Sequence, residues 1–308
     1  MIHQPMKVVT DDWVREVHNQ MVKLLDPTSL PATLDLDSED FNQKIGTAIE
    51  ESLQTLRLLV GLEFPDGAQV LEVGAGYGFA SICLAFMGFN VTALEPGGTG
   101  FEDNRLVSSL MVSRAGVNIS HIDQSAESFD FSGHSKFDLI VSNNVLEHIP
   151  DVNAALSNLC SAIGSDGIMV HSCANYAFPF EPHFGLPLVP FTPRLTRFLI
   201  PKGIRSHGVW RSLNFVTARQ VKRNAIQNGY LCIFRRGTMA SSIKRLSSDQ
   251  QFAARHALLA RLVRNKVVRT IAVRGLSLPV QIATPMDFLI CGEMRANSKS
   301  VKAWLRND

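Results

Sequence analysis

Cysteine and long apolar runs are both scarce in this chain of 308 residues, and each scarcity excludes a class of protein. The five cysteines lie far apart and form no CxxC pair, so we expect neither a disulfide scaffold nor a structural zinc site. No run of about 18 uncharged apolar residues marks a membrane-spanning helix. The first residues, 1–12, do not resemble a signal peptide. We therefore expect a cytoplasmic protein.

Acidic residues are almost missing from one part of the chain. Residues 1–193 contain 24 acidic and 8 basic side chains, whereas residues 194–274 contain 18 basic side chains and a single acid, Asp249. Such an imbalance indicates either an anionic partner or pairing with the acidic part of the same chain. A predicted basic amphipathic helix over 255–274, with the apolar stretch 186–200, favours peripheral contact with an anionic membrane surface as the partner.

Hydrophobic periodicity divides the chain into a helical beginning and an alternating region. Two helical patterns, over about 12–25 and 38–59, precede the first strand and predict an N-terminal helical cap over residues 1–64. Short apolar strands then alternate with helices, which indicates a parallel sheet covered by helices on both faces. The predicted strands cover residues 69–73, 90–94, 118–122, 137–142, 167–173, 230–235 and 287–294.

The alternating region, predicted as one catalytic domain over residues 65–294, is interrupted twice. Residues 175–213, after the fifth strand, are rich in proline and aromatic side chains, which is typical of a lid or binding loop over an active site. Residues 240–280 are predicted as a helical insertion. The last residues, 295–308, are predicted as a C-terminal tail.

Residues 70–78 form a glycine-rich strand–turn–helix signal with the sequence Val-Leu-Glu-Val-Gly-Ala-Gly-Tyr-Gly. The three alternate glycines allow a tight turn and let a ligand approach the backbone, and a helix that begins there presents free N–H groups. A dinucleotide-binding turn requires the spacing Gly-x-Gly-x-x-Gly. Here Phe79 follows the third glycine directly, which argues against a dinucleotide oxidoreductase.

Two acidic residues refine this interpretation. Glu72, beside the turn, would repel a pyrophosphate but suits the cationic amino group of a methionine moiety. Glu95 ends the second predicted strand, 21 residues after Gly74, where a carboxylate can accept hydrogen bonds from both hydroxyls of a ribose. Because NAD-binding proteins share the second feature, Glu95 indicates a nucleoside without identifying the cofactor.

Together these residues resemble the class I S-adenosylmethionine-dependent methyltransferases. The similarity continues through residues 124–127, 137–142 and 145–149, and it is greatest to the small-molecule branch that includes ubiquinone-pathway O-methyltransferases. It covers residues 65–175 and, more loosely, 214–294. The resemblance implies an α/β fold with a Rossmann-like, doubly wound, seven-stranded, mostly parallel sheet. The last strand would be antiparallel, the N-terminal helices would form a cap, and the insertion after strand five would be a lid.

The resemblance also implies S-adenosyl-L-methionine as the cofactor and a set of residues that bind it. Glu72 and the glycines would hold the methionine portion, Glu95 the ribose, and Asn143 and Asn144 would lie beneath the methyl-bearing sulfur. Ser125 stands where many relatives have Asp, so we expect adenine recognition through backbone groups. The predicted set is Glu72, Gly74, Ala75, Gly76, Tyr77, Gly78, Glu95, Pro96, Ser125, Ala126, Asn143 and Asn144.

Two histidines are candidate catalytic residues, because imidazole titrates near neutral pH. His148 follows the fourth strand and His183 lies in the insertion; either could remove the proton of an acceptor hydroxyl. The alternatives are that His148 is a packing residue and that His183 is ordinary loop surface. Some relatives bind a metal through a Glu-x-x-Glu-His run, but Asn144 occupies its first position here, so we predict no metal.

The predicted reaction is methyl transfer to a hydroxyl, or an amine, of a small-molecule, lipid or glycan-type acceptor. The sulfonium methyl is already activated, so the protein has to place the nucleophile in line and exclude water. One alternative is an RNA or protein methyltransferase that uses the basic segment 194–274. Nucleic acid is not expected, because residues 143–146 lack the Asn/Asp-Pro-Pro-aromatic run of base-amino methylases. The other alternative is a non-catalytic binding protein of the same fold.

Overall fold

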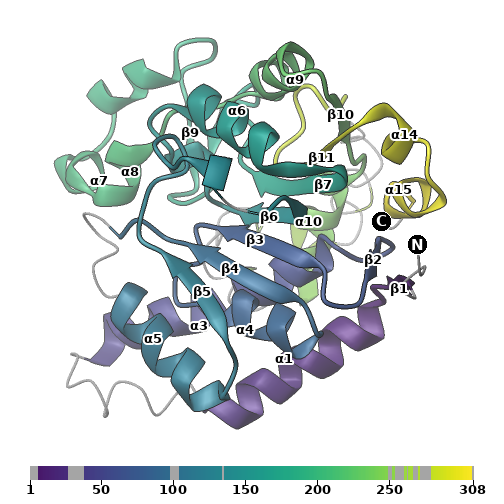
Figure 1. Cartoon of the computed structure of the whole chain (residues 1–308). Helices are drawn as coiled ribbons and strands as arrows, with labels where there is room; N and C mark the ends of the chain where they lie inside the picture. Colours follow the sequence, from purple (N-terminus) through teal and green to yellow (C-terminus); the bar gives the residue numbers. More distant parts are fainter. Residues whose placement is uncertain are drawn as a thin grey trace.

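The computed structural model describes residues 6–26, 38–97, 104–133, 135–248 and 279–306, with a few single positions between 252 and 270. Its centre is a seven-stranded sheet with the strand order β10-β11-β7-β6-β3-β4-β5 (Figure 1). The strands are β3 (Gln69–Val73), β4 (Asn90–Leu94), β5 (Ile119–Ile122), β6 (Phe137–Asn143), β7 (Ile163–Cys173), β10 (Leu231–Phe234) and β11 (Met286–Cys291). The predicted helix over 255–274 lies largely outside the described residues.

Strand directions confirm the predicted sheet. β3 pairs in parallel with β4 and β6, β4 with β5, and β6 with β7. β11 is antiparallel to both of its neighbours, β7 and β10. The prediction extended this last strand to residue 294, but it ends at Cys291 because Gly292 is the N-cap of helix α14 (Glu293–Ala296).

Helices cover both faces of the sheet, as a doubly wound fold requires. In Figure 1, α1 (Asp11–Leu25), α3 (Ser38–Arg57), α4 (Phe79–Phe86) and α5 (Asn104–Ala115) lie on one side, and α6 (Val152–Ala162) and α9 (Ala218–Gln227) on the other. Successive strand side chains point to opposite faces. Val70 and Leu139 accordingly belong to the core under α1, α3 and α4, whereas Leu71 and Ile140 belong to the core under α6 and α9.

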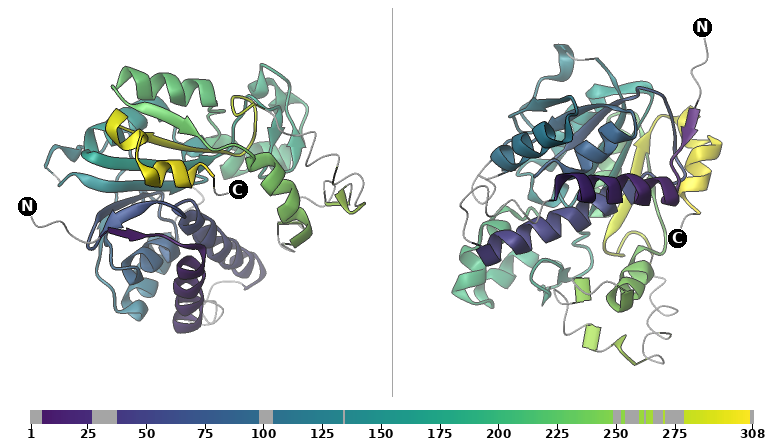
Figure 2. Two further views of the ribbon diagram at one scale, coloured as in Figure 1. Left: turned by 90° about the vertical axis from the view of Figure 1, so that its right-hand side faces the viewer. Right: turned by 90° about the horizontal axis from the view of Figure 1, so that it is seen from below.

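The chain ends add elements that were not predicted. β1 (Met6–Val8) pairs antiparallel with β2 (Glu63–Pro65) within the predicted cap. The predicted C-terminal tail over 295–308 contains α15 (Lys299–Trp304), which packs into the core. Trp304 is fully buried, and its indole Nε1 donates to the carbonyl of Leu58 at 2.6 Å. Figure 2 shows α1 and α3 side by side on one face of the sheet.

The insertion after β7 has a small core of its own. It contains the hairpin β8 (Phe180–Glu181) and β9 (Leu186–Pro187), the 3₁₀ helix η4 (Pro193–Phe198), α7 (Lys202–Ser206) and α8 (Gly208–Ser212). Tyr176, Leu188, Trp210 and Leu213 form its buried centre. The later helix α10 (Thr238–Ser248) begins two residues before the predicted helical insertion. No helix within the described ranges is long and apolar enough to cross a membrane.

Candidate active site

The glycine turn between β3 and α4 contains two kinds of glycine. Gly74, Gly76 and Gly78 all have positive φ angles, of 70°, 53° and 81°, which favour glycine over any other residue. A Cβ on Gly74 would lie 2.4 Å from Val145, and one on Gly78 would lie 2.6 Å from the Ser108 hydroxyl. A Cβ on Gly76 would meet no atom within 4 Å. The outer glycines therefore serve packing, and the middle one faces open space where a ligand fits.

Glu72 lies at the base of this open space, with 5% of its surface exposed. Burial raises the pKa of its carboxyl group to about 8, against the opposing effect of the hydrogen bond that the Ser81 hydroxyl donates to it. The charge of Glu95 raises the pKa of Glu72 further. A cationic group bound here would favour the ionised carboxylate, so the residue fits the amino group of a methionine moiety.

Glu95 is held against the same turn. The backbone N–H of Gly76 donates to Glu95 Oε2 at 2.8 Å, and the turn itself is fixed by the N–H of Gly74, which donates to the carbonyl of Leu94 at 2.7 Å. Parallel pairing of β3 with β4 brings the two strand ends together. Glu72 and Glu95, the carboxylates predicted to bind the methionine and the ribose, therefore lie at the ends of neighbouring strands.

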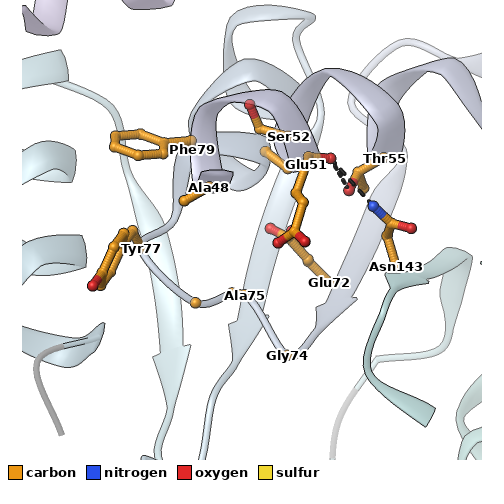
Figure 3. A pocket seen from close by; sticks show the side chains of 12 residues that line it. Ala48, Glu51, Ser52, Thr55, Glu72, Gly74, Ala75, Tyr77, Phe79 and Asn143 are labelled. Carbon is orange, nitrogen blue, oxygen red and sulfur yellow. Dashed lines mark hydrogen bonds between the residues drawn. The ribbon is translucent and has the colours of Figure 1, made fainter. Parts of the chain in front are cut away.

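A pocket with an empty volume of about 410 Å³ opens at this point (Figure 3). Six of the predicted cofactor residues line it: Glu72, Gly74, Ala75, Gly76, Tyr77 and Asn143. The other six do not belong to its lining: Gly78, Glu95, Pro96, Ser125, Ala126 and Asn144. Ser125 Oγ lies 2.7 Å from Ser128 Oγ, and the carbonyl of Ala126 accepts a hydrogen bond from the Asn158 amide at 3.0 Å.

Helix α3 forms the opposite wall of the pocket, which sequence analysis missed. It contributes Ala48, Glu51, Ser52 and Thr55. Ser52 and Thr55 are only 3% and 4% exposed. The sequence does contain a signal for this wall. Polar residues at 51, 52 and 55 follow one another on a helix that the sequence analysis interpreted from its apolar face alone. The predicted N-terminal cap therefore contributes directly to the pocket.

Glu51 connects this pocket to a second group of side chains. Its Oε1 accepts a hydrogen bond from Asn144 Nδ2 at 3.2 Å, and its backbone carbonyl accepts one from Asn143 Nδ2 at 3.3 Å. Figure 3 shows the Glu51 side chain reaching toward Glu72. On its other side, the charge of Glu51 raises the pKa of both Glu147 and His183. Glu51 thus lies between the cofactor pocket and the predicted catalytic histidines.

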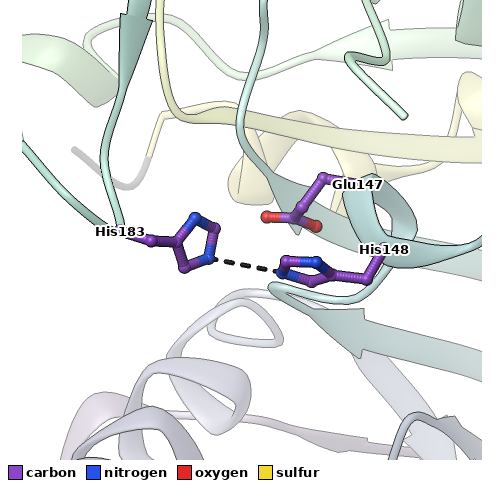
Figure 4. Close-up of side chains that lie close together, drawn as sticks. All are labelled: Glu147, His148 and His183. Carbon is purple, nitrogen blue, oxygen red and sulfur yellow. Dashed lines mark hydrogen bonds between the residues drawn. The ribbon is translucent and has the colours of Figure 1, made fainter. Parts of the chain in front are cut away.

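The two predicted catalytic histidines face each other (Figure 4). His148, on the 3₁₀ helix η3 (Leu146–His148), has its Nε2 3.4 Å from Nε2 of His183. His148 Nδ1 lies 2.8 Å from the hydroxyl of Ser212, which itself donates to the carbonyl of Val209. The hydroxyl has one proton and donates it to that carbonyl, so it accepts from His148 Nδ1–H. The Nε2 of neutral His148 therefore carries a lone pair directed at His183.

Glu181 determines the state of His183. Its Oε1 accepts from His183 Nδ1 at 2.6 Å, and its Oε2 accepts from the backbone N–H of Phe184 at 2.8 Å. The Glu181 side chain is fully buried, whereas that of His183 is 26% exposed. Burial lowers the pKa of His183, but the hydrogen bond and charge of Glu181, together with the charges of Glu147 and Glu51, outweigh it, so the pKa of His183 is raised. His148 differs, because burial and the neighbouring His183 lower its pKa to about 3.

Glu147 lies beneath the histidine pair and is fully buried. Burial raises the pKa of Glu147 to about 7. Its Oε1 accepts from the N–H of Ala174 at 3.3 Å, while its Oε2 has no hydrogen-bond partner among the described residues. Ligand atoms of Glu147, His148 and His183 lie within 4.8 Å of one another, a spacing that a metal ion could use. The absence of a metal, inferred from Asn144, stays a prediction.

The insertion completes this group of residues. It supplies Glu181, His183 and Ser212, while His148 comes from η3, which follows β6. By contrast, His171 lies within β7, is fully buried and has its Nδ1 2.7 Å from Ser142 Oγ, so it belongs to the core and not to this group. Glu181 lies two positions before His183 in the sequence, but its hydrogen bonds depend on the hairpin β8–β9, which the sequence pattern does not predict.

Comparison with known proteins identifies the family of this chain. A family model described as a methyltransferase domain matches residues 46–246. An uncharacterized protein of Mycobacterium tuberculosis is 35% identical over 201 residues, which is 63% of this chain and 68% of that protein. The ubiquinone biosynthesis O-methyltransferase of Paramagnetospirillum magneticum is 32% identical over 110 residues, 36% of this chain and 42% of that enzyme.

Among solved structures, phosphoethanolamine N-methyltransferase 2 of Haemonchus contortus, in complex with S-adenosyl-L-methionine, aligns with a TM-score of 0.44 and 13% identity. The alignment covers 78% of this chain and 51% of that one. The family match extends over well over half of the chain, so this protein belongs to the methyltransferase-domain family. It is a class I methyltransferase whose methyl donor is S-adenosylmethionine, as the motifs of β3, α4 and β6 predict.

Proposed function

We propose that the enzyme transfers the methyl group of S-adenosylmethionine to a hydroxyl group, or an amine, of a small-molecule, lipid or glycan-type acceptor. The bound cofactor supplies a methyl group already activated on a sulfonium. The observation that carries the proposal is the contact between His148 and His183, reinforced by Glu181, next to the pocket wall at Glu51. A proton-accepting group at this place is what a hydroxyl acceptor needs.

The residues have different parts in this proposal. His183 accepts the proton of the acceptor hydroxyl on Nε2, because its Nδ1–H is already donated to Glu181. His148 stays neutral at its low pKa, and its Nε2 lone pair, 3.4 Å from Nε2 of His183, stabilises the positive charge of the resulting imidazolium. Glu181 positions His183 and stabilises the imidazolium. The negative charges of Glu147 and Glu51 add to that stabilisation.

Exclusion of water is the second requirement. The insertion supplies His183 and α3 supplies Glu51, to which Asn143 and Asn144 both hydrogen-bond, so we infer that these two segments cover the acceptor. Restricting an acceptor in this way converts a bimolecular encounter into a positioned reaction, which in favourable cases is worth about 7–11 kcal/mol of the barrier. The two segments come from different parts of the chain, so acceptor specificity depends on both.

The test is an acceptor panel with methyl-labelled cofactor, analysed by mass spectrometry. Phenols, primary alcohols and amines of matched size would be compared, together with short RNA and peptide substrates. We expect label on a hydroxyl or amine of a small molecule. Label only on RNA or peptide would favour the alternative use of the basic segment 194–274. Cofactor binding without label on any acceptor of an extract would favour a non-catalytic binding protein.

A further inference from the structure

The outer end of the insertion exposes a cluster of large apolar side chains. We call it the insertion tip, and it consists of Phe191, Leu195, Phe198 and Leu199, which are 103%, 51%, 64% and 76% exposed. These four residues occupy a stretch of nine positions around η4. Scattered exposed apolar residues need no explanation, but a contiguous group of them marks an interaction surface.

At the tip a polar side chain is buried and apolar side chains are exposed, the opposite of what is expected for a loop in water. Thr196 is 2% exposed, and its hydroxyl accepts from the N–H of Val189 at 2.9 Å. Leu195 and Phe198 on the same 3₁₀ helix point outward instead. Phe191 has a φ of 64°, a conformation that is uncommon for bulky residues, and its side chain is fully exposed. The backbone therefore presents the apolar groups rather than burying them.

Exposed basic side chains surround the tip. Arg194, Arg197, Lys202 and Arg205 are all exposed, and none forms an ion pair with any residue that the structure describes. The guanidinium of Arg197 lies 4.6 Å from the ring centre of Phe198. The sequence has no acid between Glu181 and Asp249, so nothing nearby in the chain neutralises them.

Internal pairing does not account for this part of the basic segment. Of the basic residues over 194–248, those with ion pairs in the described structure are Arg235, with Asp287 at 3.8 Å, and Arg245, with Glu50 at 3.7 Å. Both lie outside the insertion. Of these two residues, only Arg245 pairs with an acid from residues 1–193. The cations of the tip therefore remain available to an external anionic partner.

We propose that the insertion tip docks on an anionic membrane surface, with Phe191, Phe198 and Leu199 entering the interface and the surrounding cations meeting lipid headgroups. Apolar side chains beside cations are the combination that binds such an interface. RNA would satisfy the cations, but its phosphates would leave Leu195 and Leu199 in water. The bilayer satisfies both groups, which is why the observations favour it.

Docking in this way has a geometric consequence for the site. The same insertion contains Glu181 and His183 at its inner end, and α7 and α8 lie beside the carboxyl ends of the strands in Figure 1. A tip held at a membrane would bring the acceptor side of the enzyme close to that surface. The docking proposal does not depend on which acceptor group is methylated, so the docking proposal and the proposed function can be contradicted separately.

The experiment is flotation of the full chain with vesicles of phosphatidylcholine alone or mixed with phosphatidylglycerol. We expect binding to the mixed vesicles only, and weaker binding at high salt because the attraction is screened. Phe198→Ser combined with Leu199→Ser, and separately Arg194→Glu with Arg197→Glu, should each lower partitioning about tenfold or more. Ile226→Ser and Lys222→Glu on α9 change an equally exposed apolar residue and cation elsewhere, and should leave binding unchanged.

Two readouts keep the outcome clear. Cofactor affinity by calorimetry should be the same in all variants, which shows that they fold. Tip variants that float like the unaltered protein would overturn the proposal. Binding of a short RNA that is lost in the Arg194→Glu, Arg197→Glu variant but kept in the Phe198→Ser, Leu199→Ser variant, without vesicle binding, would overturn it in favour of a nucleic-acid surface.

Discussion

The cofactor side and the acceptor side of the active site are built in opposite ways. On the cofactor side, the glycine turn comes from one short strand–turn–helix and meets the end of the next strand, and backbone atoms fix it: Gly76 N–H holds Glu95, and Gly74 N–H holds the turn. Helix α3 supplies the opposite wall of that pocket. On the acceptor side, the histidine pair joins two segments 35 positions apart, and side-chain hydrogen bonds hold it.

This difference separates local from long-range contributions to the site. The glycine turn, which places a carboxylate beside open space for a nucleoside, depends on few local residues. The proposed acceptor side depends on the insertion, so we expect a change there to alter what is methylated without disturbing cofactor binding, whereas α3 contributes to both sides. The following predictions test whether the two sides are in fact separable.

The largest effect is expected at Gly76. Gly76→Val would put a branched side chain into the open space and strain a left-handed backbone, so we expect no measurable binding of S-adenosylmethionine by calorimetry. Gly88→Val is the matched control, since Gly88 is also left-handed and has no atom near its Cβ position. That control should bind normally. Normal binding by the Gly76 variant would show that the open space is not the cofactor site.

His183→Ala tests the acceptor side alone. Loss of the proton acceptor should lower kcat by about 10²–10⁴-fold, while cofactor affinity stays nearly unchanged. His121→Ala, an exposed histidine on β5, should retain full turnover. A parallel loss of turnover and cofactor binding in the His183 variant would indicate a folding role and would break the separation between the two sides.

Glu181→Gln tests how His183 is tuned. The base must be unprotonated, so kcat/KM should rise with pH through a pKa above the ordinary value of His, because Glu181 raises that of His183. Removing the charge lowers this pKa and should move the rising limb to lower pH. An unchanged pH profile with reduced turnover would mean that Glu181 only supports the hairpin.

Glu72 predicts a proton linkage on the cofactor side. With a pKa of about 8 the carboxyl group is mostly protonated at pH 7, and a bound ammonium group favours the ionised form. Binding should therefore release a proton, and affinity should increase as the pH rises toward 8. Calorimetry in buffers of different ionisation enthalpy measures this release. Glu72→Gln should abolish it and cost about 1.5–3 kcal/mol of binding; equal heats in all buffers would contradict the linkage.

Chelation should have the smallest effect. Dialysis against EDTA is expected to change turnover by less than about twofold, because proton transfer by the imidazole pair, and no Lewis acid, is the proposed chemistry. Donor atoms of Glu147, His148 and His183 lie close enough together to bind a metal ion, so this experiment can contradict the proposal. A loss of activity that a divalent cation restores would instead identify them as metal ligands.

Much of the fold could be predicted because its signals are local. The central strands are continuous apolar runs, as in Leu139–Val141, which is fully buried, and such runs are typical of parallel strands covered on both faces. The glycine turn and Glu95 follow a short, fixed spacing. His148 could be identified because it belongs to the motif over residues 145–149, which follows β6 closely in the sequence.

What could not be predicted depends on contacts between distant segments. Nothing in the periodicity of α3 distinguishes Glu51, which faces the pocket, from a solvent-exposed acid. Trp304 is an apolar residue near the chain end, and its hydrogen bond to Leu58 spans 246 positions. The contact between His148 and His183 requires the fold of the insertion, whose sequence has no helical or strand period of its own.

The position of Trp210 makes the insertion observable by itself. The chain has three tryptophans. Trp13 lies on the cap, Trp304 lies beneath the guanidinium of Arg235 at 4.1 Å, and Trp210 is 7% exposed in the small core of the insertion, near Phe184 and Phe215. With the other two replaced by phenylalanine, the emission of Trp210 reports on the surroundings of the insertion alone. Its response to an added acceptor can then be measured separately from the chemical step.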